Sequence, residues 1–232
     1  MLFRKLLVLF FLFNSYVSVA EESAGLNGVI SYTMPNFPVG LRGIMAGDGE
    51  VVVAVTLDEQ GEVTDSVTLL ATNEAFSRSA LDAVGDWKFL PAASETWPRR
   101  EILQFDFKRS GVVTSLSHEE AAREGFASTA HYQISTVQWQ ELDSEPQRLA
   151  GTMPKVSKSA LDAHGKQALV INFVIDTDGK VRVPVAFSIT DKSLATSVLN
   201  AVRTWQFTPP VHDNKPVLVE VTRALVLADS GS

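Results

Sequence analysis

The sequence contains no cysteine, and this absence excludes two arrangements that are common among small exported proteins. A disulfide framework, which stabilises secreted domains with thin cores, cannot form. A lipoprotein anchor on an N-terminal cysteine is excluded for the same reason. The stability of the folded chain must therefore come from buried apolar surface.

Basic residues are also few, since 20 Lys and Arg stand against 27 Asp and Glu and give a net charge of -7. Proteins that bind nucleic acid need basic side chains that displace counterions from the phosphates. The composition therefore argues against nucleic acid as a partner. The negative charge is typical of a protein that stays soluble through self-repulsion.

Only one long apolar run is present, and it lies at the N-terminus. Arg4 and Lys5 precede the apolar residues 6–13, and small residues follow at Ser18 and Ala20. The run ends at Asn14, short of the roughly 20 residues that a spanning helix needs. This pattern predicts a cleaved signal peptide over residues 1–20 and export to the periplasm. An uncleaved membrane anchor is the alternative.

Arrangements that carry catalysis are missing as well. The four histidines are scattered, at positions 118, 131, 164 and 212, and no Gly-x-Ser-x-Gly elbow places a serine beside one of them. The segment Asp176-Thr177-Asp178-Gly179 begins like a calcium loop but lacks the glutamate at the twelfth position. His118-Glu119 begins like a zinc-protease helix, but Ala122 stands where the second histidine is needed. We therefore predict no enzyme, no catalytic or metal-binding residue and no cofactor.

The dominant positive feature is an internal repeat, which appears when the sequence is compared with itself at an offset of 118 positions. No insertion or deletion is needed between residues 47 and 98. The identical pairs fall on turn, core and helix-breaking positions: Gly47 and Gly165, Asp58 and Asp176, Gly61 and Gly179, Val63 and Val181, Trp87 and Trp205, Phe89 and Phe207, Pro91 and Pro209, Pro98 and Pro216. The chain therefore carries two copies of one folding unit.

Each copy begins with a predicted hairpin. Residues 51–57 and 169–175 alternate between two faces with a period of two, which is typical of strands. Asp58 to Gly61, repeated as Asp176 to Gly179, supplies a tight turn in which glycine tolerates a positive φ. A second strand follows each turn.

A helix is predicted next, because the apolar spacing changes to the helical period. Phe76, Ala80, Val84 and Trp87 form one stripe, and the second copy repeats the stripe up to Trp205. Asn73 and Asp191 are candidate N-caps, and a proline after each helix prevents its continuation. The tryptophans and the phenylalanines that follow are assigned to the core.

The last strand of each copy carries Leu103, Phe105 and Phe107, or Val219, Val221 and Leu225. Arg223 falls in the inward register where the first copy has Phe105. Because an unpaired buried guanidinium is costly, we expect a bulge, an ion pair or a partner contact at Arg223.

These elements predict an α+β fold with two repeated domains, each a three-stranded antiparallel sheet with helices on one face. The expected boundaries are 26–110 for the first domain and 131–228 for the second. Between them, residues 111–130 form a linker, in which Ser117 to Glu120 has the spacing of a capping box and predicts a short helix. Residues 131–139 are an extra strand candidate.

The ordered motifs resemble the TonB C-terminal domain family. The second copy carries Leu142-Asp143 with Pro146, Asp178-Gly179-Lys180-Val181, Ala201-Val202, Trp205-Gln206-Phe207-Thr208-Pro209 and Lys215-Pro216-Val217. The first copy matches at fewer positions. The long proline-rich spacer of the family's energy transducers is absent, and so is the Tyr-Pro pair that commonly precedes the first domain helix.

The resemblance implies a periplasmic protein-binding module that recognises an extended partner segment by strand addition beside its last strand. It implies a protein partner in the cell envelope, such as a TonB-dependent receptor or another TonB-system component, and a homodimer is a further candidate assembly. The candidate binding edges lie in residues 102–107 and 219–225, and Trp97, in a loop, is a candidate exposed contact. The candidate edge residues are Ile102, Leu103, Gln104 and Phe105 in the first copy, and Val219, Glu220, Val221, Thr222 and Arg223 in the second.

Three alternatives remain open from the sequence. In the first, the other copy or the leader segment covers the edges, which would make residues 102–107 and 219–225 ordinary core strands. An uncleaved N-terminus would make the chain a membrane-anchored energy transducer of the TonB family, and a mature N-terminus at Glu21 would exclude this. A secreted hydrolase would require the histidines and carboxylates to converge in one cleft.

Overall fold

The computed structural model describes residues 28–42, 47–91, 93–94, 96–117, 132–154, 169–187 and 191–225. The predicted signal peptide and the helix predicted after Ser117 lie outside these residues, as do His118, His131 and His164. Among the described helices, none is long and apolar enough to cross a membrane.

The first copy folds as a hairpin, a helix and a third strand. Its elements are β2 (Gly49–Leu57), β3 (Val63–Ala71), α2 (Glu74–Val84) and β6 (Arg99–Lys108). Strand β2 pairs antiparallel with both β3 and β6, so β2 is the central strand of the three. The side chain of Asn73 accepts a hydrogen bond from the backbone N–H of Ala75 and caps α2 as predicted.

The second copy repeats this arrangement. Its elements are β10 (Leu169–Ile175), β11 (Val181–Phe187), α5 (Lys192–Arg203) and β15 (Leu218–Leu225). Strand β10 pairs antiparallel with β11 and β15. Asp191 caps α5 by accepting hydrogen bonds from the backbone N–H groups of Ser193 and Leu194.

A separate apolar core lies under each helix, and both cores are built from the predicted stripes. In the first copy the inward residues of β2 and β6 pack against Phe76, Ala80, Val84 and Trp87. Val198, Val202 and Trp205 occupy the corresponding places in the second. Trp87 is 1% exposed and Trp205 is 6% exposed, which confirms their assignment to the core.

The two hairpin turns also behave alike. Asp176 accepts hydrogen bonds from the backbone N–H groups of Asp178 and Lys180, and Asp58 does the same in the first copy. Gly179 has a φ of +81°, and its carbonyl accepts from the backbone N–H of Phe207 at 2.8 Å. The aspartate and glycine of the motif are therefore explained by the turn and by its attachment to the segment after the helix.

A further repeat, which the offset of 118 does not reveal, lies at an offset of 119 positions, where Thr33-Met34-Pro35 recurs as Thr152-Met153-Pro154. The indole N–H of Trp87 donates to the Thr33 carbonyl at 3.0 Å, and that of Trp205 donates to the Thr152 carbonyl at 2.8 Å. Just before each tripeptide, a short leading strand pairs with the segment after the helix. These pairs are β1 (Val29–Ser31) with β4 (Lys88–Phe89) and β9 (Arg148–Ala150) with β12 (Gln206–Phe207).

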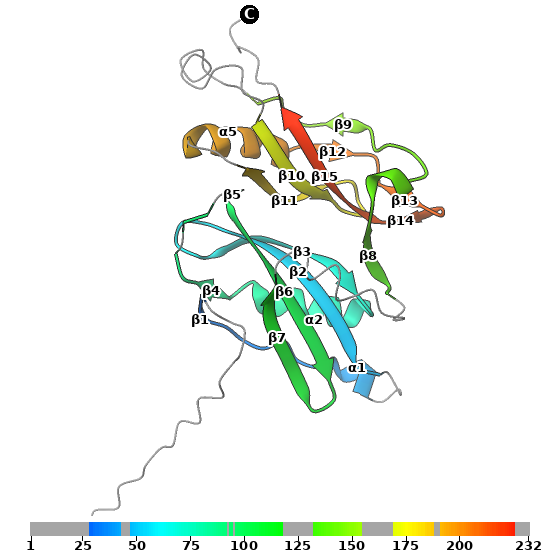
Figure 1. Ribbon diagram of the computed structural model, residues 1–232. Helices are drawn as coiled ribbons and strands as arrows, with labels where there is room; N and C mark the ends of the chain where they lie inside the picture. The colour runs from blue at the N-terminus through cyan, green and yellow to red at the C-terminus, as the bar shows by residue number, and fades with distance from the viewer. Residues whose placement is uncertain are drawn as a thin grey trace, which may run out of the picture.

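The two copies do not form the two separate three-stranded sheets that the sequence predicts. They join into one nine-stranded sheet with the order β5-β11-β10-β15-β8-β3-β2-β6-β7. The added strands are β5 (Thr96–Trp97), β7 (Gly111–Ser117) and β8 (Ile134–Val137). In Figure 1 the copies lie one above the other, and β8 runs between them. This strand confirms the extra strand predicted within residues 131–139.

The outer faces of the two hairpins are buried against each other, which was not predicted. Val52 and Ala54 of β2 belong to a third apolar cluster with Val174 of β10, Val183 of β11 and Leu218 of β15. Strand β2 is consequently buried on both of its faces. The two copies thus share a core in addition to a continuous sheet.

The remaining elements are short. They are α1 (Val39–Arg42), the 3₁₀ turn η1 (Trp139–Glu141), and the hairpin strands β13 (Val211–His212) and β14 (Lys215–Pro216).

Candidate functional site

The predicted binding edge of the first copy is occupied by the chain itself. Strand β7, which lies where the sequence predicts the start of a linker, pairs with β6 along its length, from Ile102 opposite Ser117 to Lys108 opposite Gly111. The backbone of Ile102, Leu103, Gln104 and Phe105 therefore faces a strand on each side. The expectation of an open edge here was wrong, because a tight turn after Lys108 returns the chain alongside β6.

Among the described residues, a strand covers the corresponding edge of the second copy only at its beginning. Leu218 and Val219 of β15 pair in parallel with Thr136 and Val137 of β8. From Glu220 to Leu225, β15 pairs with β10 on one side and with no strand among the described residues on the other. All five candidate edge residues of the second copy lie on β15, and four of them, Glu220 to Arg223, lie on this open stretch.

The side chains of the open stretch alternate between two environments. Val221 points into the second core, whereas Glu220 lies 3.3 Å from Arg100 of the first copy. Thr222 is exposed, and its hydroxyl accepts a hydrogen bond from the side-chain amide of Asn172 at 3.0 Å. One face of the edge is therefore anchored to the core and the other to the first copy, which holds the backbone of β15 in place.

Arg223 does not enter the core. It lies directly opposite Ile171 of β10 in an unbroken register, but its side chain is exposed and its guanidinium carbon lies 4.8 Å from the centre of the Trp139 ring. None of the three expected explanations, a bulge, an ion pair or a partner contact, is needed, since the indole face attracts the cation. In the pairing, Leu225 rather than Arg223 takes the place of Phe105, because Leu225 lies opposite Leu169 as Phe105 lies opposite Val51.

The sequence suggested that Trp97 is an exposed contact residue in a loop, but in the structure it lies in a strand and packs against the second copy. Strand β5 pairs with the outer edge of β11, with Trp97 opposite Ala186. The Trp97 indole N–H donates to the Thr196 hydroxyl of α5 at 3.0 Å, and the ammonium of Lys192 lies 4.5 Å from the ring centre. Trp97 therefore attaches the first copy to the second.

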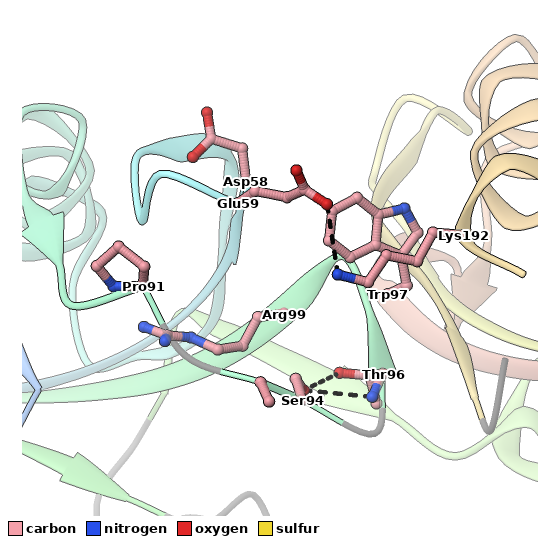
Figure 2. A pocket seen from close by; sticks show the side chains of 9 residues that line it. Asp58, Glu59, Pro91, Ser94, Thr96, Trp97, Arg99 and Lys192 are labelled. Carbon is pink, nitrogen blue, oxygen red and sulfur yellow. Dashed lines mark hydrogen bonds and ion pairs between the residues drawn. The ribbon is translucent and has the colours of Figure 1, made fainter. Parts of the chain in front are cut away.

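A groove of about 330 Å³ lies beside Trp97 at the boundary between the copies. Figure 2 shows Glu59 and Lys192 reaching across it to form an ion pair of 3.3 Å. Arg99 donates to the carbonyl of Leu90 at 2.7 Å and lies 3.0 Å from Glu101. The charged side chains of the groove are thus engaged with one another or with the backbone.

Two arginines carry most of the polar contact between the copies. Arg100 of β6 donates to the side-chain oxygen of Asn172 at 2.6 Å and to the carbonyl of Val183 at 2.7 Å. Arg182 of β11 donates to Asp65 of β3 at 2.6 Å.

Asp65 also accepts from the backbone N–H of Val183 at 2.7 Å. Val183 has a φ of +43°, an unusual conformation for a β-branched residue. Both of its backbone groups are therefore held by charged side chains of the first copy.

One cluster has the composition of a metal site. Ligand atoms of Asp143, His212 and Asp213 lie within 4.8 Å of one another. Both carboxylate oxygens of Asp143 already accept backbone hydrogen bonds, from Asp213 at 3.1 Å and from Asn214 at 3.0 Å. These two residues form the turn of the β13–β14 hairpin and have positive φ values. The cluster is therefore explained by the turn, and so is the aspartate of the Leu142-Asp143 motif.

We expect Asp143→Ala to lower the free energy of unfolding by about 1–2 kcal/mol, because two backbone donors of a strained turn lose their acceptor. Urea denaturation followed by tryptophan fluorescence measures this loss. Asp178→Ala is the matched control, because Asp178 is an exposed turn aspartate with only a 3.7 Å ion pair to Lys180. Its expected change stays within about 0.5 kcal/mol. Equal losses for the two variants would contradict the role given to Asp143.

Comparison with known proteins agrees with the repeat. The family model described as the Gram-negative bacterial TonB protein C-terminal matches twice, over residues 44–109 and 160–226. Each match spans one hairpin, one helix and one last strand, and together they confirm the resemblance in both copies. No curated protein shows significant similarity to the chain.

Proposed function

The chain belongs to the family of the Gram-negative bacterial TonB protein C-terminal domain, and on that premise we propose that it binds an extended segment of a protein partner by strand addition to β15. Domains of this family are interaction modules that contact proteins of the cell envelope, such as outer-membrane receptors. The proposed setting is the periplasm, with a TonB-dependent receptor or another component of a TonB system as the partner.

The observation that carries the proposal is the difference between the two last strands. Strand β6 has a strand on each side, whereas β15 from Glu220 to Leu225 has one only on the β10 side among the described residues. Alternate residues of an edge strand point their N–H and C=O groups away from the sheet, where another chain can pair with them. The second copy is therefore the binding copy, and the first copy supports it.

The surroundings of this edge suit an added strand. The inward residues Val219 and Val221 anchor β15 in the second core, and Glu220 is held by Arg100. The backbone that offers its donors and acceptors is thus rigid before a partner arrives, which reduces the ordering cost of association. Main-chain hydrogen bonds then provide affinity, and the alternate side chains of the partner provide selectivity.

A photoreactive amino acid placed at Thr222 in the full chain, expressed in its native cell, tests the proposal. We expect crosslinks to one protein of the envelope, because Thr222 lies in the middle of the open stretch. The matched control carries the same amino acid at Gln104, which occupies the corresponding sequence position in the first copy and is flanked by β2 and β7. We expect little or no intermolecular crosslinking at Gln104.

Two results would count against strand addition to β15. The first is equal crosslinking from both positions, because the sealed edge cannot accept a strand. The second is the absence of any intermolecular crosslink from Thr222 when the protein is folded and correctly exported.

A further inference from the structure

The open stretch of β15 has a neighbour that is not a strand. After pairing with β15 at Val137, the chain leaves the strand conformation at Gln138 and forms the single turn η1. Trp139, the first residue of η1, packs against the rim of the second core and lies over Arg223. The indole is therefore beside β15 four residues beyond the last pair with β8.

The position of this indole conflicts with an added strand. Arg223 lies directly opposite Ile171, whose side chain is fully buried beneath α5, so Arg223 projects from the same face of the sheet. A strand added to β15 would lie about 4.7–4.9 Å away and would place a side chain beside Arg223 on that face. Trp139 already contacts Arg223 there.

Trp139 is held by few contacts. Besides Arg223 and the core rim, its indole N–H reaches the Glu145 carboxylate at 3.4 Å. The η1 turn is closed by local bonds, chiefly the 2.8 Å bond from the backbone N–H of Gln138 to the Glu141 carboxylate. A longer-range contact of 2.6 Å joins the His212 ring to the Glu141 carbonyl and ties the end of η1 to the β13–β14 hairpin. None of these bonds involves the backbone of β15, so the Trp139 side chain can move aside without breaking the sheet.

From this geometry we infer that Trp139 is a gate on the β15 edge: its indole covers Arg223 in the free protein, and a partner strand binds by displacing it. The inference rests on the proposed strand addition and adds its regulation. Arg223 then has two alternative neighbours, the indole in the closed state and the partner strand in the open state. The affinity of the edge is lowered by the free energy of the contact that must be given up.

The experiment uses the full mature chain and a synthetic peptide with the sequence Arg109 to Ser117, labelled with a fluorophore. This sequence contains β7, the strand that occupies β6, which is the counterpart of β15 in the first copy. We expect Trp139→Ala to bind the peptide about two- to fivefold more tightly than the wild type, since an exposed cation–indole contact is lost from the free state. Trp139→Phe should fall between them, because a smaller aromatic face remains.

Hydrogen exchange of the same samples locates the peptide. Protection of backbone amides in residues 220–225 is expected on binding, in the wild type and in both Trp139 variants. Trp97→Ala is the matched control, because it removes another indole–cation contact, with Lys192, beside the outer edge of β11 on the other side of the second copy. Its peptide affinity should equal that of the wild type.

The outcomes separate the gate from strand addition. If wild type and Trp139→Ala bind the peptide equally and both protect residues 220–225, the gate is overturned and strand addition stands. If neither protects residues 220–225, strand addition to β15 is overturned and the gate with it. An equal gain for Trp97→Ala would also overturn the gate, because general loosening of the fold would then explain the effect.

Discussion

Gly179→Ala is expected to lower the free energy of unfolding by about 2–4 kcal/mol. Gly179 has a φ of +81°, a conformation that L side chains rarely adopt. A β-carbon at this position would also meet the carbonyl oxygen of Phe207 well inside van der Waals contact. That oxygen belongs to a backbone segment that is hydrogen-bonded to the turn. Neither the turn nor this segment can therefore move to relieve the clash without losing that hydrogen bond. Urea denaturation monitored by tryptophan fluorescence measures the loss.

Gly85→Ala is the matched control for this prediction. Gly85 ends α2 with a φ of -57°, and a β-carbon there would come no nearer than 3.9 Å to another atom. We expect this variant to be more stable than the wild type by about 0.4–1 kcal/mol, since alanine reduces the conformational freedom of the unfolded chain. A loss for Gly85→Ala as large as that for Gly179→Ala would mean that the turn geometry is not the cause.

Arg100→Ala is expected to have the second large effect, a loss of about 3–5 kcal/mol. The Arg100 side chain is only 8% exposed and reaches three acceptors of the second copy, on Asn172, Val183 and Glu220. Its removal leaves Glu220, 16% exposed, without this counter-charge at the boundary between the copies. Denaturation curves of the variant and the wild type measure the difference.

A double substitution shows whether the charge or the packing is responsible. Adding Glu220→Gln to Arg100→Ala should recover part of the loss, because no carboxylate then remains at the boundary without its guanidinium. Arg203→Ala is the control for the loss of an arginine, since Arg203 is exposed and bonds only its helical neighbour Asn200 among the described contacts. Its expected change is within about 0.5 kcal/mol. A loss below 1 kcal/mol for Arg100→Ala would contradict the prediction that the contacts of Arg100 between the copies stabilise the fold.

The two copies consequently behave as one unit of structure. The outer faces of the two hairpins are held together by a shared core, which includes Val52, Val174 and Val183. The hydrogen bonds of Arg100 and Arg182 add polar contacts between them. Under the proposed function, this arrangement lets the first copy support the binding edge of the second. The difference between the two last strands has a separate cause, because β7 covers the edge of β6 and no described strand covers β15 beyond Val219.

Part of the candidate site could be predicted from the sequence. The pattern of the last strand identified β15 and four residues of its open stretch, because alternation and the family order both point to it. Trp139 was missed, since a single tryptophan in a turn has no periodicity that links it to a strand 84 positions later. Arg223 was matched to Phe105, whereas Leu225 takes that place in the pairing, because a shift of two positions leaves the pattern of faces unchanged.

The leading segments could have been predicted better. The repeated Thr-Met-Pro lies one position outside the register of the main repeat, and a search at neighbouring offsets would find it. Its role depends on the backbone carbonyls of Thr33 and Thr152, which accept the indole N–H groups. The tripeptide therefore shows where the leading segment meets the tryptophan, whereas the hydrogen bond from the indole uses a backbone carbonyl and no threonine side chain.

By itself, the sequence determined the parts that local chemistry controls: the two hairpins with Gly61 and Gly179 in their turns, the two capped helices, and the apolar stripes that end in Trp87 and Trp205. Each of these depends on side chains a few residues apart, whose spacing can be read along the chain. Only the tertiary structure decided which strand edges are covered. Edge pairing uses N–H and C=O groups that nearly every residue carries, so the sequence does not distinguish β7 on β6 from an open edge at β15.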